Sequence, residues 1–211
     1  KQLSKERIYS ELEKIIKLKN FYELFQNDFL VDIFNLIFPE FIHLDRIKSL
    51  EKLSKNSNIH MDKDLIFAAM LLDFSENYKY FFHKYNVSNE TKDNLNLYSK
   101  ILKNIKSNKF FFTNDLKMNI FFYGKEKIKK IFIINNIINK KSFSSKSKEI
   151  LSKIEQTFIP KFPVTGNDLL KQGVKSGKEV GTILKKIEKK WIENNFQISS
   201  EDIKILLKKN I

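Results

Sequence analysis

The fold is decided by a stretch that reads Pro160-Lys-Phe-Pro163-Val-Thr165-Gly166-Asn-Asp168-Leu-Leu-Lys-Gln-Gly173-Val-Lys175-Ser-Gly177-Lys178-Glu-Val-Gly181-Thr-Ile-Leu-Lys185-Lys186-Ile187-Glu-Lys-Lys-Trp191-Ile-Glu-Asn-Asn-Phe196. Four of the chain's five glycines and two of its three prolines lie within it. A glycine inside a helix costs roughly 1 kcal/mol relative to alanine, so three closely spaced glycines need a structural reason. Thr165 and Asp168 have the spacing of a capping box, and Gly173 falls where a helix C-cap is expected. A second helix opens at Gly177 and runs to about Asn194, so the stretch predicts two helices joined by a tight turn.

The turn between these two helices is the best candidate for a binding site. Backbone N–H groups at the start of a helix, together with the positive end of its dipole, hold a phosphate without reading base sequence. Lysines flank the turn and continue along the second helix, which adds positive charge. We therefore predict an RNA-binding site made of Gly173, Lys175, Gly177, Lys178, Gly181, Lys185 and Lys186. A helical hairpin whose glycines serve only packing, with solvated lysines, explains the same residues equally well.

Two aromatic residues follow the glycines. Trp191 and Phe196 are potential stacking platforms for nucleic-acid bases. Trp191 is nevertheless in helical phase with Leu184 and Ile187, which favours a place in the core for both aromatic side chains.

The remainder of the chain shows apolar residues at helical spacing and no convincing alternation of the kind that strands show. The sequence predicts an all-α fold, an elongated array of about ten to thirteen helices. Ser4 caps a first helix that runs to Lys19, and a polar segment at Ser54–Asn58 and a loop at Lys140–Ser147 interrupt the array. The expected helical segments between and after these are Phe21–Phe38 (broken near Asn27), Asp62–Phe74, Ser88–Lys106, Asp115–Tyr123, Lys125–Ile138 and a last helix capped by Ser199 and Asp202.

The charge of the chain favours a polyanionic partner. The formal net charge is +14 and the pI is about 9.6, values typical of proteins that bind nucleic acid. Residues 140–211 hold 16 lysines and 8 acids, so more than half of the positive excess lies in the last third. Only Arg7 and Arg46 are arginines, and AT-rich coding is an alternative origin of such a lysine bias.

Several classes of protein are disfavoured by composition. No apolar run is long enough to span a membrane, and no signal peptide is visible at the start. The absence of cysteine fits a reducing compartment, so we expect a cytoplasmic protein. Because the chain begins with Lys1 rather than methionine, we expect it to be a piece of something longer.

No self-sufficient catalytic centre is visible. His43, His60 and His83 are far apart and lack the spacing of a metal site, and no glycine-rich nucleotide-binding motif exists. Asp62 and Asp64 form an Asp-x-Asp pair of a kind that binds Mg²⁺ elsewhere. Here they lie at a helix start, where the dipole and the capping requirement already favour acids. We therefore expect neither a metal site nor a catalytic residue in this chain.

The glycine-rich stretch resembles a known family. Phe162-Pro-Val-Thr-Gly-Asn-Asp168-Leu-Leu-x-x-Gly173-Val-x-x-Gly177-x-x-Val-Gly181-x-x-Leu184, followed by Trp191 and Phe196, is similar to the C-terminal tail of bacterial class II tRNA nucleotidyltransferases. These are the CCA-adding enzymes and their poly(A) polymerase relatives. More loosely, Ser4–Leu12, Leu24–Glu40, Leu65–Asp73 and Met118–Gly124 resemble the preceding helices of the same family in order.

The resemblance implies a division into a neck (1–60), a helical body (61–158) and a tail with the glycine-rich hairpin (159–211). It also implies a function: gripping the backbone of tRNA while a catalytic head adds nucleotides to the 3′ end. The head's phosphate motif, its two metal-binding aspartates and its template residues have no match here, so Mg²⁺ and CTP or ATP would belong to a head outside this chain. Arg7 and Glu11 match the helix that braces the head.

Three readings of the resemblance stay open. The chain is a tRNA-binding portion of a CCA-adding enzyme or of a poly(A) polymerase, or it is a decayed helical scaffold without an RNA function. In a variant of the first reading, a separately encoded catalytic head docks on an exposed apolar face around Ile8, Leu12 and Ile15.

Overall fold

The computed structural model describes residues 4–18, 21–56, 60–141, 143–175 and 177–208 of the 211. The structure is 71% helical, with 13 helices and no strand among these residues, which confirms the all-α prediction. The helices are α1 (Lys5–Ile16), η1 (Phe21–Gln26, a 3₁₀ helix), α2 (Asp28–Ile37), α3 (Asp45–Asn56), α4 (Lys63–Leu71), α5 (Tyr78–Tyr85), α6 (Asn89–Ser107), α7 (Leu116–Tyr123), α8 (Lys125–Ile138), α9 (Ser145–Gln156), α10 (Gly166–Lys171), α11 (Lys178–Glu193) and α12 (Ser200–Lys208).

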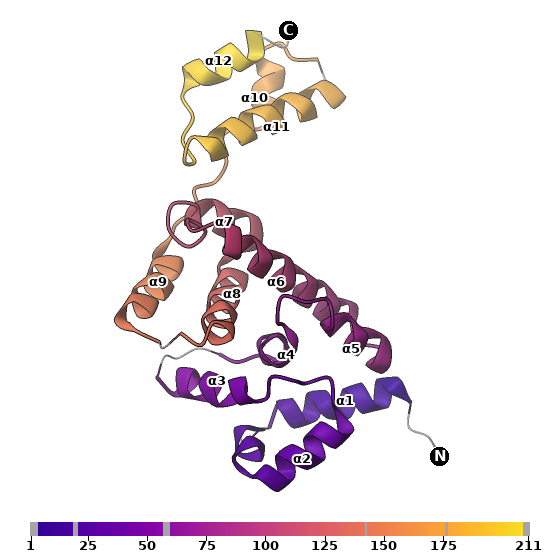
Figure 1. Ribbon diagram of the computed structural model, residues 1–211. Coiled ribbons are helices and arrows are strands. Elements are labelled where there is room, and N and C mark those ends of the chain that lie inside the picture. The colour runs from indigo at the N-terminus through magenta and orange to yellow at the C-terminus, as the bar shows by residue number, and fades with distance from the viewer. Residues whose placement is uncertain (1–3, 19–20, 57–59, 142, 176, 209–211) are drawn as a thin grey trace.

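The helices form an elongated array (Figure 1). Helices α1 and α2 lie at one end, α10, α11 and α12 lie at the other, and α6 crosses the middle. Buried apolar side chains form two separate clusters, one running from Tyr9 to Ile154 and a smaller one from Val164 to Leu207. The expected boundary between neck and body, at residue 60, falls inside the first cluster. The three-part division stays a prediction.

Helix α4 is the centre of the larger cluster. All its residues from Asp64 to Leu71 are buried, and it packs against α1, α3, α6 and α8. Asp64 is the one charged residue among them, with 5% of its surface exposed. Its carboxylate accepts hydrogen bonds from Thr91 Oγ1 at 3.0 Å and Asn94 Nδ2 at 2.7 Å. These donors compensate the loss of water, because a buried charge is tolerated only when hydrogen-bonded or paired.

Asp62 has the capping role that the sequence indicated. Its Oδ1 accepts a hydrogen bond from Leu65 N at 3.0 Å, and its Oδ2 forms an ion pair with Lys130 of α8. Both members of the Asp-x-Asp pair are therefore occupied by protein donors.

Several helix starts are confirmed by their caps. Ser4 Oγ accepts a hydrogen bond from Arg7 N, Asn27 caps α2, and Ser88 caps α6. Gly124 separates α7 from α8 as predicted, with a φ of 83°. The first helix ends at Ile16, before the predicted end at Lys19, which lies outside the described residues.

Three helices were not predicted: α3, α5 and α9. Helix α3 continues to Asn56, so the expected polar spacer is helical in its first part, and its second part (57–58) lies outside the described residues. Ile47, Leu50 and Leu53 provide its buried stripe, while Lys48, Ser49 and Lys52 are exposed. Helix α9 begins at Ser145, so the segment expected to be a loop up to Ser147 is shorter than expected.

The apolar face of α1 is not exposed, which corrects an expectation. Leu12 has no exposed surface, and Ile8 and Ile15 pack against the larger cluster. The exposed apolar surface lies instead on and beside α2, where Phe29 is 70% and Leu36 84% exposed. We call this surface the α2 face; its exposed residues are Phe29, Leu30, Ile33, Leu36, Ile37 and Ile42.

Candidate nucleic-acid interface

The capping box predicted in the tail is present at the start of α10. Thr165 N donates to Asp168 Oδ2 at 2.8 Å, and Asp168 N donates to Thr165 Oγ1 at 3.4 Å. The Thr165 hydroxyl, which donates to Asp168 Oδ2 at 2.6 Å, and the Thr165 N–H together lower the pKa of Asp168 below its ordinary value. Reciprocal bonds of this kind satisfy two of the unpaired donors at a helix start, so α10 begins at a fixed position despite its shortness.

The end of α10 is a Schellman motif centred on Gly173. Val174 N donates to Leu169 O at 3.1 Å, and Gly173 N donates to Leu170 O at 3.0 Å. Gly173 has a φ of 89°, which favours glycine over any residue with a Cβ. Leu169 and Val174 are both buried in the smaller cluster, so the apolar contact that usually accompanies this motif anchors the turn.

The other three glycines of the tail lie in different structural settings from Gly173. At Gly166 an added Cβ would lie 3.4 Å from Val180 Cγ1 of α11, which is about an ordinary van der Waals contact, so packing there leaves little spare room but does not require glycine. Gly177 precedes α11 with a φ of 102°, again a conformation that favours glycine. Gly181 lies in the first turns of α11, exposed, and an added Cβ there would meet no atom within 4 Å. Neither conformation nor packing within the chain explains Gly181.

Helix α11 has two opposite faces. Ile183, Ile187 and Trp191 are buried. Lys178, Gly181 and Lys185 recur at the complementary helical spacing and are exposed, so they share one side of the helix. We call these three residues the basic face of α11. The glycine lies between the two lysines, so nothing larger than a hydrogen atom covers the backbone there.

The remaining predicted site residues surround this face. Lys175 is exposed in the turn before α11, and Lys186 is exposed next to Lys185. Within the described ranges, Lys175, Lys178 and Lys185 have no carboxylate within ion-pair distance. Gly177 provides no side-chain cap, so no side chain of the N-cap residue accepts from the first backbone N–H groups of α11. All seven predicted residues are thus exposed, and Lys178, Gly181 and Lys185 share one side of α11; that they form an RNA-binding site stays a prediction.

The two aromatic residues belong to the core, which confirms the packing interpretation. Trp191 and Phe196 meet edge to face with their ring centroids 4.8 Å apart. Phe121 of α7 joins them at 5.8 Å and 5.4 Å, and Lys117 Nζ lies 4.9 Å above the Phe196 ring. This group, together with Phe162, attaches the tail to the body. The residues of α7 were not identified from the sequence, because nothing local indicates a contact across some seventy residues.

Helix α12 is held against α11 by an ion pair. Lys190 Nζ lies 2.5 Å from Asp202 Oδ1, and Ser199 and Asp202 cap the start of α12 as predicted. The Lys190 ammonium, assisted by the hydrogen bonds from Ser199, lowers the pKa of Asp202 to about 2. The smaller cluster is thereby closed on the side opposite α10.

A metal ion does not fit the described residues. No group of three histidine or acidic side chains within them is placed to hold one. Asp62 and Asp64, the only pair that the sequence suggested, already accept hydrogen bonds and an ion pair from the protein. Among the same residues, no helix combines the length and apolarity needed to cross a lipid bilayer.

Comparison with known proteins identifies the family. The family model described as tRNA nucleotidyltransferase domain 2 matches residues 59–206, well over half of the chain. The chain belongs to this tRNA nucleotidyltransferase family. The match covers most of the first cluster and the glycine-rich tail as far as residue 206, including every residue of the basic face of α11.

Individual relatives match a shorter stretch. The mitochondrial CCA tRNA nucleotidyltransferase 1 of Homo sapiens is 35% identical over 60 residues, which is 28% of this chain and 14% of that protein. The Danio rerio protein of the same name is 40% identical over 55 residues, 26% of this chain and 13% of that protein. The Mus musculus protein is 32% identical over 60 residues. The matched stretch therefore spans about one-seventh of each relative's length.

Proposed function

We propose that this chain is the tRNA-gripping portion of a CCA-adding tRNA nucleotidyltransferase. The basic face of α11 and the preceding turn would bind the sugar–phosphate backbone of tRNA. A catalytic head outside this chain would hold Mg²⁺ with CTP or ATP and add the nucleotides. The expected cytoplasmic location stays a prediction, since the relatives are mitochondrial by name.

The observation that carries this proposal is Gly181 between two exposed lysines. A glycine in an exposed helix position costs roughly 1 kcal/mol relative to alanine, and nothing within the chain compensates for it. A ligand that approaches the backbone between Lys178 and Lys185 would compensate for this cost. A second phosphate beyond the start of α11, near Lys175 and Lys178, would accept from the unpaired N–H groups of the first turn. Double-stranded RNA is recognised mainly by shape and through its phosphates, which such a surface suits.

The test is a salt titration of tRNA binding. Each neutralised phosphate adds about 0.7–0.9 to the slope of log affinity against log salt concentration. The double variant Lys175→Ala/Lys178→Ala should reduce that slope by roughly 1–2 units. Lys100→Ala/Lys109→Ala removes the same charge from exposed positions in and after α6, and should leave the slope unchanged. Equal slopes for the two double variants would reject the site.

Binding and extension assays distinguish this proposal from the two alternatives, a decayed scaffold and a portion of a poly(A) polymerase. A decayed scaffold whose charge reflects lysine bias alone should bind heparin as tightly as tRNA at moderate salt. A poly(A) polymerase portion should bind tRNA no better than other RNA, and with its head should extend RNA with adenylate only.

The α2 face favours a second proposal: the catalytic head covers it. Six exposed apolar side chains together make a patch that a soluble surface seldom leaves uncovered. The test is to add a head-domain polypeptide of the family and assay CCA addition with CTP, ATP and Mg²⁺. Leu36→Lys should abolish any gain in activity over the head alone. Phe158→Lys changes a similarly exposed side chain outside the α2 face and should leave the gain in activity intact. No gain with the unaltered chain would contradict the proposal.

A further inference from the structure

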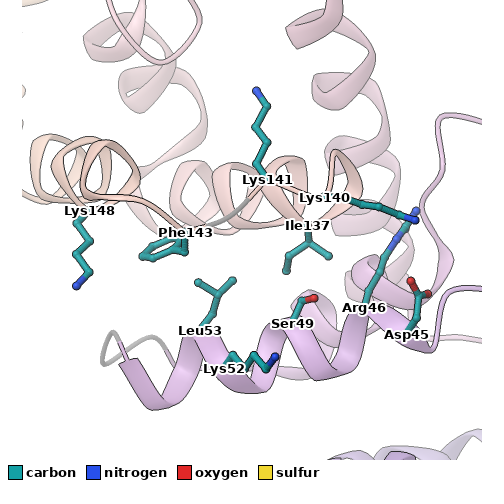
Figure 2. Close-up of a pocket in the computed structure, with 10 residues that line it drawn as sticks. All are labelled: Asp45, Arg46, Ser49, Lys52, Leu53, Ile137, Lys140, Lys141, Phe143 and Lys148. Carbon is teal, nitrogen blue, oxygen red and sulfur yellow. The ribbon is translucent and has the colours of Figure 1, made fainter.

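A pocket of about 720 Å³ lies between α3 and the segment that joins α8 to α9. It is remote from the basic face of α11, which belongs to the other end of the array (Figure 1). Five of the side chains that line it are cationic and one is a carboxylate. Figure 2 shows these side chains, which are Asp45, Arg46, Ser49, Lys52, Leu53, Ile137, Lys140, Lys141, Phe143 and Lys148.

The positive charge of the pocket is largely uncompensated. Among the parts of the chain that the structure describes, no ion pair involves the pocket's four lysines, which are Lys52, Lys140, Lys141 and Lys148. Arg46 is fixed by its Nη1, which donates to Ala69 O at 3.0 Å and Leu72 O at 2.6 Å at the end of α4. Burial lowers the pKa of the Arg46 guanidinium, but an arginine stays charged in proteins. The pocket therefore favours an anionic ligand.

Lys140 occupies a position where a lysine is unfavourable. Helix α8 ends in a Schellman motif, in which Lys140 N donates to Ile137 O and Lys141 N to Asn136 O. The φ of Lys140 is 50°, and the equivalent position after α10 holds Gly173. A residue with a Cβ costs roughly 1 kcal/mol in this conformation, and glycine is the usual choice. The side chain of Lys140 lines the pocket, so a role there accounts for a residue that the backbone disfavours.

The other wall of the pocket is apolar. Leu53 and Ile137 are almost fully buried beneath it, and the Phe143 ring is half-buried at its edge. In Figure 2 the Phe143 ring lies close to Leu53, while Lys140 and Arg46 lie at the opposite end, beside Asp45. The volume is in the range of small-molecule sites and far exceeds that of a simple anion. The lining therefore suits a molecule that combines an anionic group with an apolar one, and the Phe143 ring suits a planar group.

We infer that this pocket binds a nucleotide unit, with its phosphate at the end where Lys140 and Arg46 lie and its base against Phe143. Stacking of a base on an aromatic ring beside cationic side chains is the general mode of single-stranded nucleic-acid binding. The same chemistry is offered by a free mononucleotide and by one nucleotide of a single-stranded RNA. The inference goes beyond the gripping of tRNA and does not depend on the basic face of α11.

The experiment measures binding to the full chain by titration calorimetry, with 5′-AMP, inorganic phosphate and a short oligoadenylate as separate ligands. AMP should bind more tightly than phosphate. Lys140→Gly should weaken both roughly three- to tenfold, as expected for loss of one charged donor. Its thermal midpoint should stay equal or rise, because glycine is favoured at this position. Phe143→Leu should weaken AMP but not phosphate, and Lys100→Ala should change neither.

The outcomes distinguish an RNA strand from a free nucleotide as the ligand, and they also show which results would overturn the inference. Tighter binding of the oligoadenylate than of AMP assigns the site to an RNA strand, and equal binding assigns it to a free nucleotide. The inference is overturned if none of the three ligands binds, if Lys140→Gly binds like the unaltered chain, or if AMP binds no better than phosphate. Lys175→Ala/Lys178→Ala should lose tRNA affinity and keep AMP affinity, so the two proposals can fail independently.

Discussion

Helices α4 and α11 differ in how much of their surface is buried. Helix α4 is buried on every side, so its sequence is nearly all apolar and its one charge is hydrogen-bonded. Helix α11 buries one stripe and exposes lysines and a glycine on the other side. A helix that only had to close the smaller cluster would gain from alanine at Gly181. The comparison teaches that the first region is built for stability and that the second gives up some stability for an accessible backbone.

The largest expected effect tests the first half of this comparison. Phe67 of α4 has no exposed surface and its ring contacts Tyr9, Phe41 and Phe81. Phe67→Ala should destabilise the larger cluster by about 3–5 kcal/mol, since a large buried ring is removed. Circular dichroism reports the loss for the whole chain. Fluorescence of Trp191, the only tryptophan, reports the tail and its contact with Phe121 of α7, and should shift less. Identical shifts would show that the two clusters unfold as one unit.

A smaller effect is expected at the buried charge. Asp64→Ala leaves Thr91 Oγ1 and Asn94 Nδ2 without their acceptor inside the larger cluster. The free energy of unfolding, measured by urea denaturation, should fall by about 1–3 kcal/mol. Asp93→Ala, at an exposed position of α6, is the control and should stay within about 0.5 kcal/mol. Equal effects at the two positions would mean that the network around Asp64 contributes nothing.

Gly181→Ala tests the second half of the comparison. Because the position is helical, exposed and open, the variant should be more stable by about 0.4–1 kcal/mol. Its affinity for tRNA should nevertheless fall, since a methyl group would keep the phosphate away from the backbone. Urea denaturation and a tRNA binding curve, measured on the same preparation, check both signs. A variant that gains stability and keeps its tRNA affinity would remove the functional reason for the glycine.

The smallest effect is a pH dependence in the tail. The pKa of Asp202 is about 2 in the folded chain and about 3.9 when unfolded. The pairing with Lys190 therefore stabilises the tail fully above pH 4, and this contribution is lost as the pH falls from about 4 to about 2. The pair is solvent-accessible, so the change in the Trp191 unfolding midpoint should be modest. Asp202→Asn should abolish this part of the dependence; an unchanged profile would exclude the ion pair as its source.

Much of the tail could be predicted because its signals are local. Capping residues three positions apart, a glycine after a short helix and an apolar stripe are all visible without knowledge of distant contacts. The helix breaks at Gly124 and near Asn27 and the start of α6 at Ser88 followed from the same kind of signal.

The errors arose where the signal was not local. Helix α5 begins at Tyr78, and its N-cap residue Asn77 makes no side-chain capping hydrogen bond, so no local signal marked this helix. The apolar side chains of α1 are buried or half-buried and several of α2 are exposed, and this difference depends on which helix face packs against the larger cluster. Spacing shows that a helix has an apolar face but not which partner lies against it. The pocket of Figure 2 escaped prediction for the same reason, since its lysines come from α3, α9 and the segment between α8 and α9.

The aromatic contact between α7 and the tail has a consequence for the size of the substrate. Phe121 and Lys117 tie Trp191 and Phe196 to the end of the body, while the α2 face lies at the far end of the array. The distance between the surface proposed for tRNA and the surface proposed for the catalytic head is thus set by packed helices rather than by a linker. If both proposals hold, an RNA that bridges the two surfaces would need an arm whose length matches this fixed spacing.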